Sequence, residues 1–130
     1  MELQTKVLID TSIWIEYFRG NARIDEAVDL LIDSGRAYIT GPVMAELIQG
    51  VKTKKQAEEL LTNLKALPYV DIRKSDWSDI GFFSLEFRKK GIAIPFTDTV
   101  IACMAIKNHL CVYSLDKHFD LIEGLAKFRM

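Results

Sequence analysis

Four acidic residues stand where their carboxylates could act on one substrate. Asp10 follows the apolar run VLI, Asp116 follows CVYSL, Asp98 lies in PFTDTVIACMA and Glu46 in GPVMAELIQG. Two carboxylates about 4 Å apart repel by roughly 4 kcal/mol at an effective dielectric near 20, so a cluster of four needs protons or a cation. Oxygen ligands suit Mg²⁺ or Mn²⁺. Such a site binds phosphate oxygens and activates water for attack on phosphorus.

Each acid also has a structural explanation. Asp98 falls in the first turn of an expected helix, where the helix dipole favours negative charge. Glu46 borders the apolar stripe that contains Val43 and Leu47, so it needs a polar partner. Asp10 would be buried after its strand and needs compensation for its charge. With 18 acidic residues in the chain, separate structural roles for the four stay open.

Alternating strand and helix patterns would position these acids. Short apolar runs predict strands at residues 6–9, 37–39, 70–72 and 110–113. Helical spacing predicts helices at residues 11–20, 25–33, 42–51, 54–67, 76–89 and 97–107, with Thr11 or Ser12 capping the first. This order favours an α/β fold with a mainly parallel sheet. Asp10 and Asp116 would then face the carboxyl edge of the sheet, where ligands bind.

Composition indicates an ordinary globular chain of one domain, residues 1–130. Hydrophobic residues make up 49% and charged residues 27% of the sequence, with a formal net charge of −1. We expect no targeting signal and no membrane span, because no apolar run is long enough. Cys103 and Cys111 lie in apolar surroundings and are expected to be free thiols, which is typical of a reducing cytoplasm.

Four blocks in this order, VLIDTSIWIEYF, PVMAELIQGV, PFTDTVIACMAI and YSLDKHFDLI, resemble PIN-domain ribonucleases. The resemblance is closest to the VapC-type toxins of toxin-antitoxin pairs, and it covers essentially the whole chain. It implies a three-layer α/β/α sandwich with a mainly parallel central sheet. It also implies an acidic pocket that binds Mg²⁺ or Mn²⁺.

The resemblance assigns roles to individual residues. Asp10 and Asp98 would be the principal metal ligands, and Glu46 and Asp116 would complete the cluster and orient the water. Hydroxyl groups near the first and last acids would support them, from Thr11, Ser12 and Ser114. Leu115 stands where the family commonly has an arginine, so no basic contact is expected from that position.

The implied activity is a metal-dependent endoribonuclease that hydrolyses RNA phosphodiester bonds through metal-activated water. The protein would be the toxin of a type II pair, with a homodimeric state and a cognate antitoxin as partners. The antitoxin would cover the pocket and contact the apolar helix around Trp14 or the helix at residues 54–67.

Other interpretations stay open beside this one. The same acids could serve a catalytically silent metal- or RNA-binding module. Aspartyl-phosphate chemistry at Asp10 is disfavoured, because Ser12 stands where such phosphatases have a second Asp. His118 could serve as a general base, but a surface or structural role is expected, because a metal-bound hydroxide needs no side-chain base. The acids are expected to form a set of oxygen ligands with no histidine nearby. Trp14 and Trp77 are expected in the core or at an interface rather than stacking on bases.

Basic residues are the last group with a possible role in binding RNA. They gather at Lys52 to Lys55, at Arg73 and Lys74, and at residues 88–90. Near an acidic pocket they could hold an RNA backbone. For residues 88–90 a solvated helix end is the preferred interpretation, because cations are stable at a helix C-terminus.

Overall fold

A four-stranded parallel sheet forms the centre of the computed structural model, which describes residues 5–129. The strands are β1 (Val7–Ile9), β2 (Ala37–Thr40), β3 (Tyr69–Val70) and β4 (Cys111–Tyr113). Their order is β3-β2-β1-β4, and every pairing is parallel. The α/β prediction with a parallel sheet is therefore confirmed.

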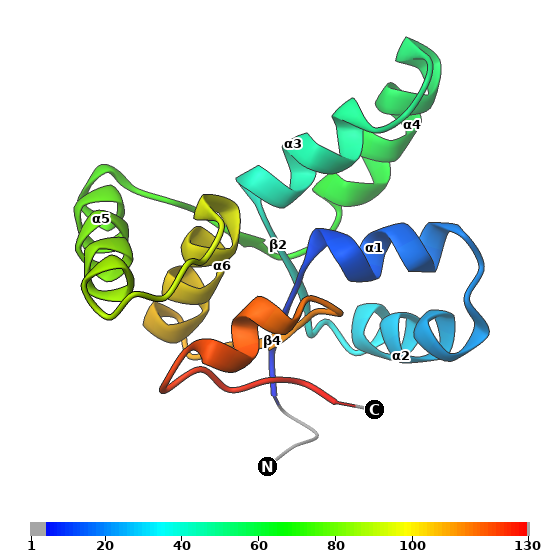
Figure 1. Ribbon diagram of the computed structural model, residues 1–130. Helices are drawn as coiled ribbons and strands as arrows, with labels where there is room; N and C mark the ends of the chain where they lie inside the picture. The colour runs from blue at the N-terminus through cyan, green and yellow to red at the C-terminus, as the bar shows by residue number, and fades with distance from the viewer. Residues whose placement is uncertain (1–4, 130) are drawn as a thin grey trace.

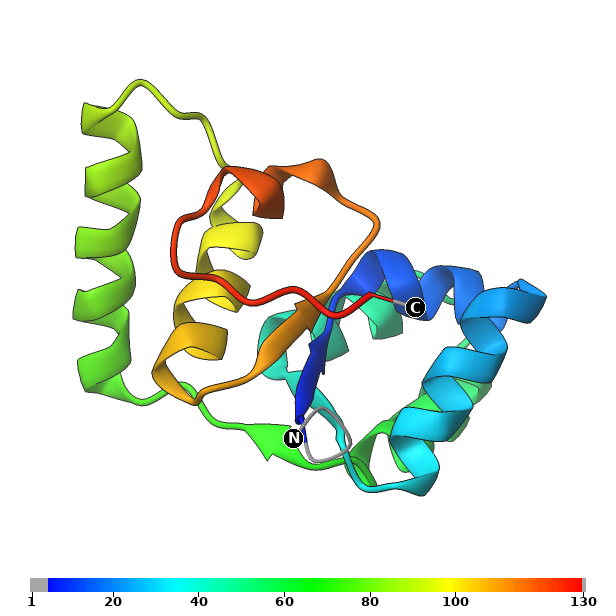
Figure 2. The ribbon, with the colours of Figure 1, turned by 90° about the horizontal axis from the view of Figure 1, so that it is seen from below.

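Six α-helices flank the strands within the described residues, in the layered arrangement expected for a PIN-like sandwich (Figure 1). The helices α5 and α6 lie on one side of the sheet and α1 to α4 on the other, as Figure 2 also shows. They are α1 (Thr11–Phe18), α2 (Ala22–Asp33), α3 (Gly41–Gln49), α4 (Lys54–Lys65), α5 (Lys74–Lys89) and α6 (Phe96–Lys107). A short 3₁₀ helix, η2 (Lys117–Leu121), follows β4.

The strand order creates a switch point between β1 and β4. From β1 the chain moves outward through β2 to β3, and then returns to pair β4 with the other edge of β1. The connections from β1 and β4 therefore leave the sheet in opposite directions and open a crevice at the carboxyl ends of these strands. Asp10 immediately follows β1, and residues 114–116 follow β4, so both lead into this crevice.

Helix α6 carries Asp98 and is the most deeply buried helix. All its residues from Asp98 to Ala105 are buried, which agrees with the prediction of a central helix from its apolar character. A chain segment surrounded by packed side chains has little freedom to shift. Asp98 is therefore presented to the crevice from a rigid support.

Several element ends differ from the predictions. Asp10 caps α1, and its side chain accepts a hydrogen bond from the Ser12 backbone, so the expected cap by Thr11 or Ser12 is wrong. Helix α2 begins at Ala22, one turn before the predicted start, because Asn21 provides a cap there. Strand β3 is confined to Tyr69–Val70, so the prediction of a strand at 70–72 is displaced.

The two tryptophans have different environments. Trp14 is 2% exposed and belongs to the core, as expected. Trp77 is 45% exposed, so it is not a core residue, and its ring stacks against that of Phe96 with centroids 6.5 Å apart. An amphipathic pattern identifies which residues share a face but not how completely another element covers that face.

Residues 5–129 contain no helix with both the length and the apolar character that a membrane crossing requires. Cys103 is buried and Cys111 is partly buried, and both are free thiols. Burial raises the pKa of both thiols, which keeps them protonated near neutral pH.

Candidate metal centre

Asp10 is held at the end of β1 by hydroxyl groups. The residue is only 5% exposed, yet its Oδ2 accepts hydrogen bonds from Ser12 Oγ at 2.8 Å and Ser114 Oγ at 2.7 Å. The Ser12 backbone N–H approaches the same oxygen at 3.4 Å. No hydrogen bond to Oδ1 occurs within residues 5–129, so one oxygen is fixed and the other stays available to a ligand.

The same two serines connect α1 to the loop after β4. Ser12 Oγ accepts a hydrogen bond from the Leu115 backbone at 3.0 Å, and Ser114 Oγ accepts one from the Asp116 backbone at 2.9 Å. The two hydroxyl oxygens are 3.2 Å apart. Residues 102 positions apart in sequence are thereby joined, and the loop that carries Asp116 is held beside Asp10.

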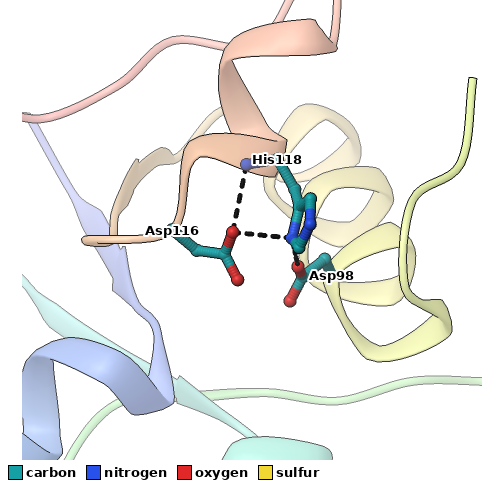
Figure 3. A group of neighbouring side chains, drawn as sticks. All are labelled: Asp98, Asp116 and His118. Atoms are coloured by element: carbon teal, nitrogen blue, oxygen red, sulfur yellow. Dashed lines mark hydrogen bonds and ion pairs between the residues drawn. The ribbon is translucent and has the colours of Figure 1, made fainter.

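Asp98, Asp116 and His118 form a compact group at the crevice (Figure 3). His118 Nδ1 lies 2.9 Å from Asp98 Oδ2 and 2.6 Å from Asp116 Oδ1. Asp98 comes from the first turn of α6, Asp116 caps η2, and His118 lies in the first turn of η2. Asp116 Oδ1 also accepts a hydrogen bond from the His118 backbone at 3.1 Å. One potential ligand atom from each of the three residues lies within 4.8 Å of the others.

Electrostatics distinguish Asp98 from an ordinary surface acid. Burial, together with the charges of Asp116 and Asp10, raises its pKa to about 6 against the opposing hydrogen bond from His118. The hydrogen bond to Asp98 is the main cause that raises the pKa of His118. The His118 ring nitrogen therefore lies between two carboxylates, at a position where positive charge is favoured.

Glu46 lies apart from this three-residue group. Its Oε1 accepts a hydrogen bond of 2.7 Å from Thr11 Oγ1, so the partner it needs comes from the residue after Asp10. The side chain is exposed on α3 rather than buried. Of the four predicted acids, the structure brings Asp98 and Asp116 into direct contact with His118, places Asp10 close enough to raise the pKa of Asp98, and links Glu46 to this edge through Thr11.

The expectation of a cluster without histidine is wrong. His118 contacts both aspartates while its side chain stays 41% exposed, which agrees with the surface position expected for it. A signal was present, since His118 follows Asp116 by two residues. Whether a side chain at that spacing turns toward the acid depends on η2, whose tight 3₁₀ turn brings the imidazole back over the capping aspartate.

The donor set fits a divalent cation. Two carboxylates and an imidazole converge from rigid elements, and a third carboxylate, Asp10, retains an oxygen without a hydrogen bond in the described chain. Burial and the neighbouring carboxylates raise the pKa of Asp98 and so disfavour its charged form, which a divalent cation would favour. The acidic cluster is thus consistent with a metal site.

Comparisons with known proteins agree with this geometry. Residues 7–125 match the PIN domain family. The ribonuclease VapC1 of Methanocaldococcus jannaschii is 33% identical over 124 residues, which cover 92% of this chain and 83% of that protein. The ribonuclease VapC11 of Mycobacterium tuberculosis is 29% identical over 133 residues, with 95% and 96% covered.

Solved structures show the same fold at lower identity. A chain of VapBC2 from Rickettsia felis, bound to a DNA fragment from its promoter, superimposes with a TM-score of 0.81 at 22% identity and covers 97% of this chain and 99% of that one. DNA-bound VapBC from Salmonella typhimurium gives a TM-score of 0.78 at 23% identity, with 96% and 98% covered. On the match over residues 7–125 and the 33% identity to VapC1, this chain belongs to the PIN domain family and is a homologue of the VapC ribonucleases.

Proposed function

We propose that this protein is a Mg²⁺- or Mn²⁺-dependent endoribonuclease, the toxin of a type II toxin-antitoxin pair. The observation that carries the proposal is the group of Asp98, Asp116 and His118 at the switch point of a PIN domain. The imidazole nitrogen among the donors favours Mn²⁺ over Mg²⁺, which prefers oxygen ligands. Residues 1–130 would form one such domain, working in the cytoplasm.

The proposed roles follow from the contacts. Asp98 and Asp116 would hold the cation, with His118 either as a third ligand or as a positioning residue for both carboxylates. Asp10 would contribute its second oxygen while Ser12 and Ser114 fix the first. Glu46, oriented by Thr11, would position the attacking water. A cation bound there supplies Lewis-acid polarisation of the phosphate and lowers the pKa of water.

Within that site the protein's own groups control geometry. The serine hydroxyls prevent Asp10 from rotating, and the burial of α6 prevents Asp98 from shifting. Fixed carboxylates would hold a cation without reorganisation as negative charge develops on the phosphoryl oxygens. No side-chain nucleophile is needed, because water attacks the phosphodiester.

The direct test is cleavage of single-stranded RNA by the purified protein with Mg²⁺, Mn²⁺ or a chelator. We expect cleavage only with a divalent cation, and a loss of at least about 100-fold in rate for Asp10→Asn, because even the loss of a group that only supports a metal ligand costs 10- to 100-fold. Asn can still accept the serine hydrogen bonds, so the fold should be kept. Cleavage by Asp10→Asn at the wild-type rate would overturn the proposed role of this residue.

A cognate antitoxin and a second copy of this chain are the proposed partners, and the antitoxin is supported by the similarity to a toxin-antitoxin complex from Klebsiella pneumoniae. The surface of α1 and α2 offers exposed apolar side chains for such contacts, including Ile15, Phe18 and Leu30. We expect the chain purified alone to have a dimeric mass by light scattering. A monomeric mass at micromolar concentration would contradict the proposed dimer.

A further inference from the structure

A second feature of the crevice is a pocket that shares Asp116 with the metal centre. It has a volume of about 250 Å³ and lies between the loop after β4, η2 and the C-terminal segment. Its lining includes three cations, Lys117, Lys127 and Arg129, and two carboxylates, Asp116 and Asp120. The cations outnumber the carboxylates of this lining even without a metal, and a divalent cation held by Asp116 would make the lining more positive still.

The cations on the C-terminal segment are held in defined positions. The Val112 backbone N–H donates to Ala126 O at 2.9 Å, and the Phe128 N–H donates to Val112 O at 2.8 Å. Lys127 thus pairs with Val112 in a parallel bridge beside β4, where Figure 2 shows the segment in red. The ring of Phe128 packs edge-on against Tyr113, with centroids 5.0 Å apart.

Side chains alternate along an extended segment, so Lys127 and Arg129 project to the side opposite Phe128. Both turn toward η2, where Asp120 Oδ1 lies 2.8 Å from Lys127 Nζ and 3.7 Å from Arg129 Nη2. One carboxylate on η2 therefore gathers two cations from another segment at the edge of the metal centre. Exposed ion pairs of this kind contribute little to stability, which leaves these cations free to exchange partners.

We infer that this pocket binds the RNA phosphate adjacent to the scissile one through Lys127 and Arg129, and that Asp120 orients these cations while competing with the phosphate for them. The inference rests on the proposed ribonuclease function. Lys127 and Arg129 would supply the contact to the RNA backbone that Leu115 cannot make, and they do so from the C-terminal segment. Phosphate contacts fix the register of a nucleic acid on a protein without reading its sequence.

Binding is measured by the fluorescence anisotropy of a labelled single-stranded RNA in a chelator, so that cleavage does not interfere. We expect Lys127→Ala to weaken binding about three- to tenfold and to lower the slope of log affinity against log salt by about 0.7, the value for one lost phosphate contact on a single strand. Lys127→Arg should bind like wild type. In cleavage assays with Mn²⁺, Lys127→Ala should raise KM more than it lowers kcat.

The discriminating variant is Asp120→Asn, which should tighten binding about threefold because it releases both cations to the phosphate. This gain should disappear when Lys127→Ala and Arg129→Ala are also present. Glu86→Gln is the matched control, since Glu86 pairs with Lys89 on α5, outside the pocket, and its removal changes the net charge equally. It should leave the affinity for RNA nearly unchanged.

An affinity of Asp120→Asn equal to or weaker than that of wild type would overturn the inference, because the ion pairs would then serve only to hold the C-terminal segment. A gain of the same size in Glu86→Gln would also overturn it, as an effect of net charge alone. If wild type cleaves RNA while these variants bind as wild type does, this inference fails and the proposed function stands. If wild type neither binds nor cleaves RNA, both fail.

Discussion

Asp98→Asn is expected to abolish RNA cleavage and at the same time to make the metal-free protein harder to unfold. The two effects have one cause, because Asp98 carries a charge that the fold alone does not compensate. Burial and the neighbouring carboxylates raise its pKa to about 6 from an ordinary value of 3.8. A buried carboxylate that no cation neutralises destabilises the folded protein when it is ionised.

The sign of the pH dependence follows from this shift. Because the folded-state pKa lies above the unfolded-state value, the stability contribution of Asp98 is complete below about pH 4 and is lost as pH rises to about 6. Above about pH 6, this shift corresponds to a loss of at most about 3 kcal/mol from the free energy of unfolding. The substitution to Asn loses the charged hydrogen bond with His118, which offsets part of the benefit of removing the charge. We therefore expect Asp98→Asn to raise the free energy of unfolding by about 1 to 2 kcal/mol near pH 8 and to leave it unchanged near pH 4.

Urea unfolding of both proteins in a chelator across this pH range measures the effect. Asp71→Asn, which replaces an exposed acid outside the cluster, is the matched control and should change stability little at any pH. Cleavage in Mn²⁺ should fall by at least about 100-fold for Asp98→Asn. A variant that is less stable than wild type at pH 8 would show that Asp98 is a structural carboxylate.

The second large effect is stabilisation by metal. A ligand present at 100 times its dissociation constant raises the free energy of unfolding by about 2.7 kcal/mol, and we expect this from Mn²⁺ near pH 8. Protons compete for Asp98 below its pKa of about 6, so the stabilisation should shrink steadily toward pH 5. Thermal unfolding with and without Mn²⁺ at several pH values gives the result.

Asp116→Asn should remove this stabilisation, because Asp116 is one of the three converging groups. Asp33→Asn, at the end of α2 and outside that group, should respond to Mn²⁺ as wild type does. Equal stabilisation of wild type, Asp116→Asn and Asp33→Asn by Mn²⁺ would place the cation elsewhere.

The sequence was sufficient to predict the frame of the site. Apolar residues around the whole of α6 indicated a central helix, and the apolar runs before Asp10 and Asp116 indicated parallel strands that end at one edge. These inferences succeed because burial on all sides leaves a pattern that local sequence displays. The functional roles of Asp10, Glu46, Asp98 and Asp116 stay predictions until variants are measured.

Contacts between distant residues could not be predicted in the same way. Support of the acids by Ser12 and Ser114 was expected only from the family resemblance, and no local pattern indicated that Ser114, 104 residues away, donates to the same Asp10 oxygen as Ser12. His118 reaches Asp98 only because η2 turns tightly after Asp116. The ion pairs of Asp120 with Lys127 and Arg129 depend on a C-terminal segment that has no regular pattern of its own.

The most direct test of a cation site at this crevice is titration of the metal-free protein with Mn²⁺ near pH 8, with free Mn²⁺ followed by electron paramagnetic resonance. We predict a saturable site in wild type that is lost or strongly weakened in both Asp98→Asn and Asp116→Asn, and kept in Asp33→Asn. Binding of Mn²⁺ that none of the cluster substitutions reduces, or no binding by wild type with or without RNA, would contradict the account.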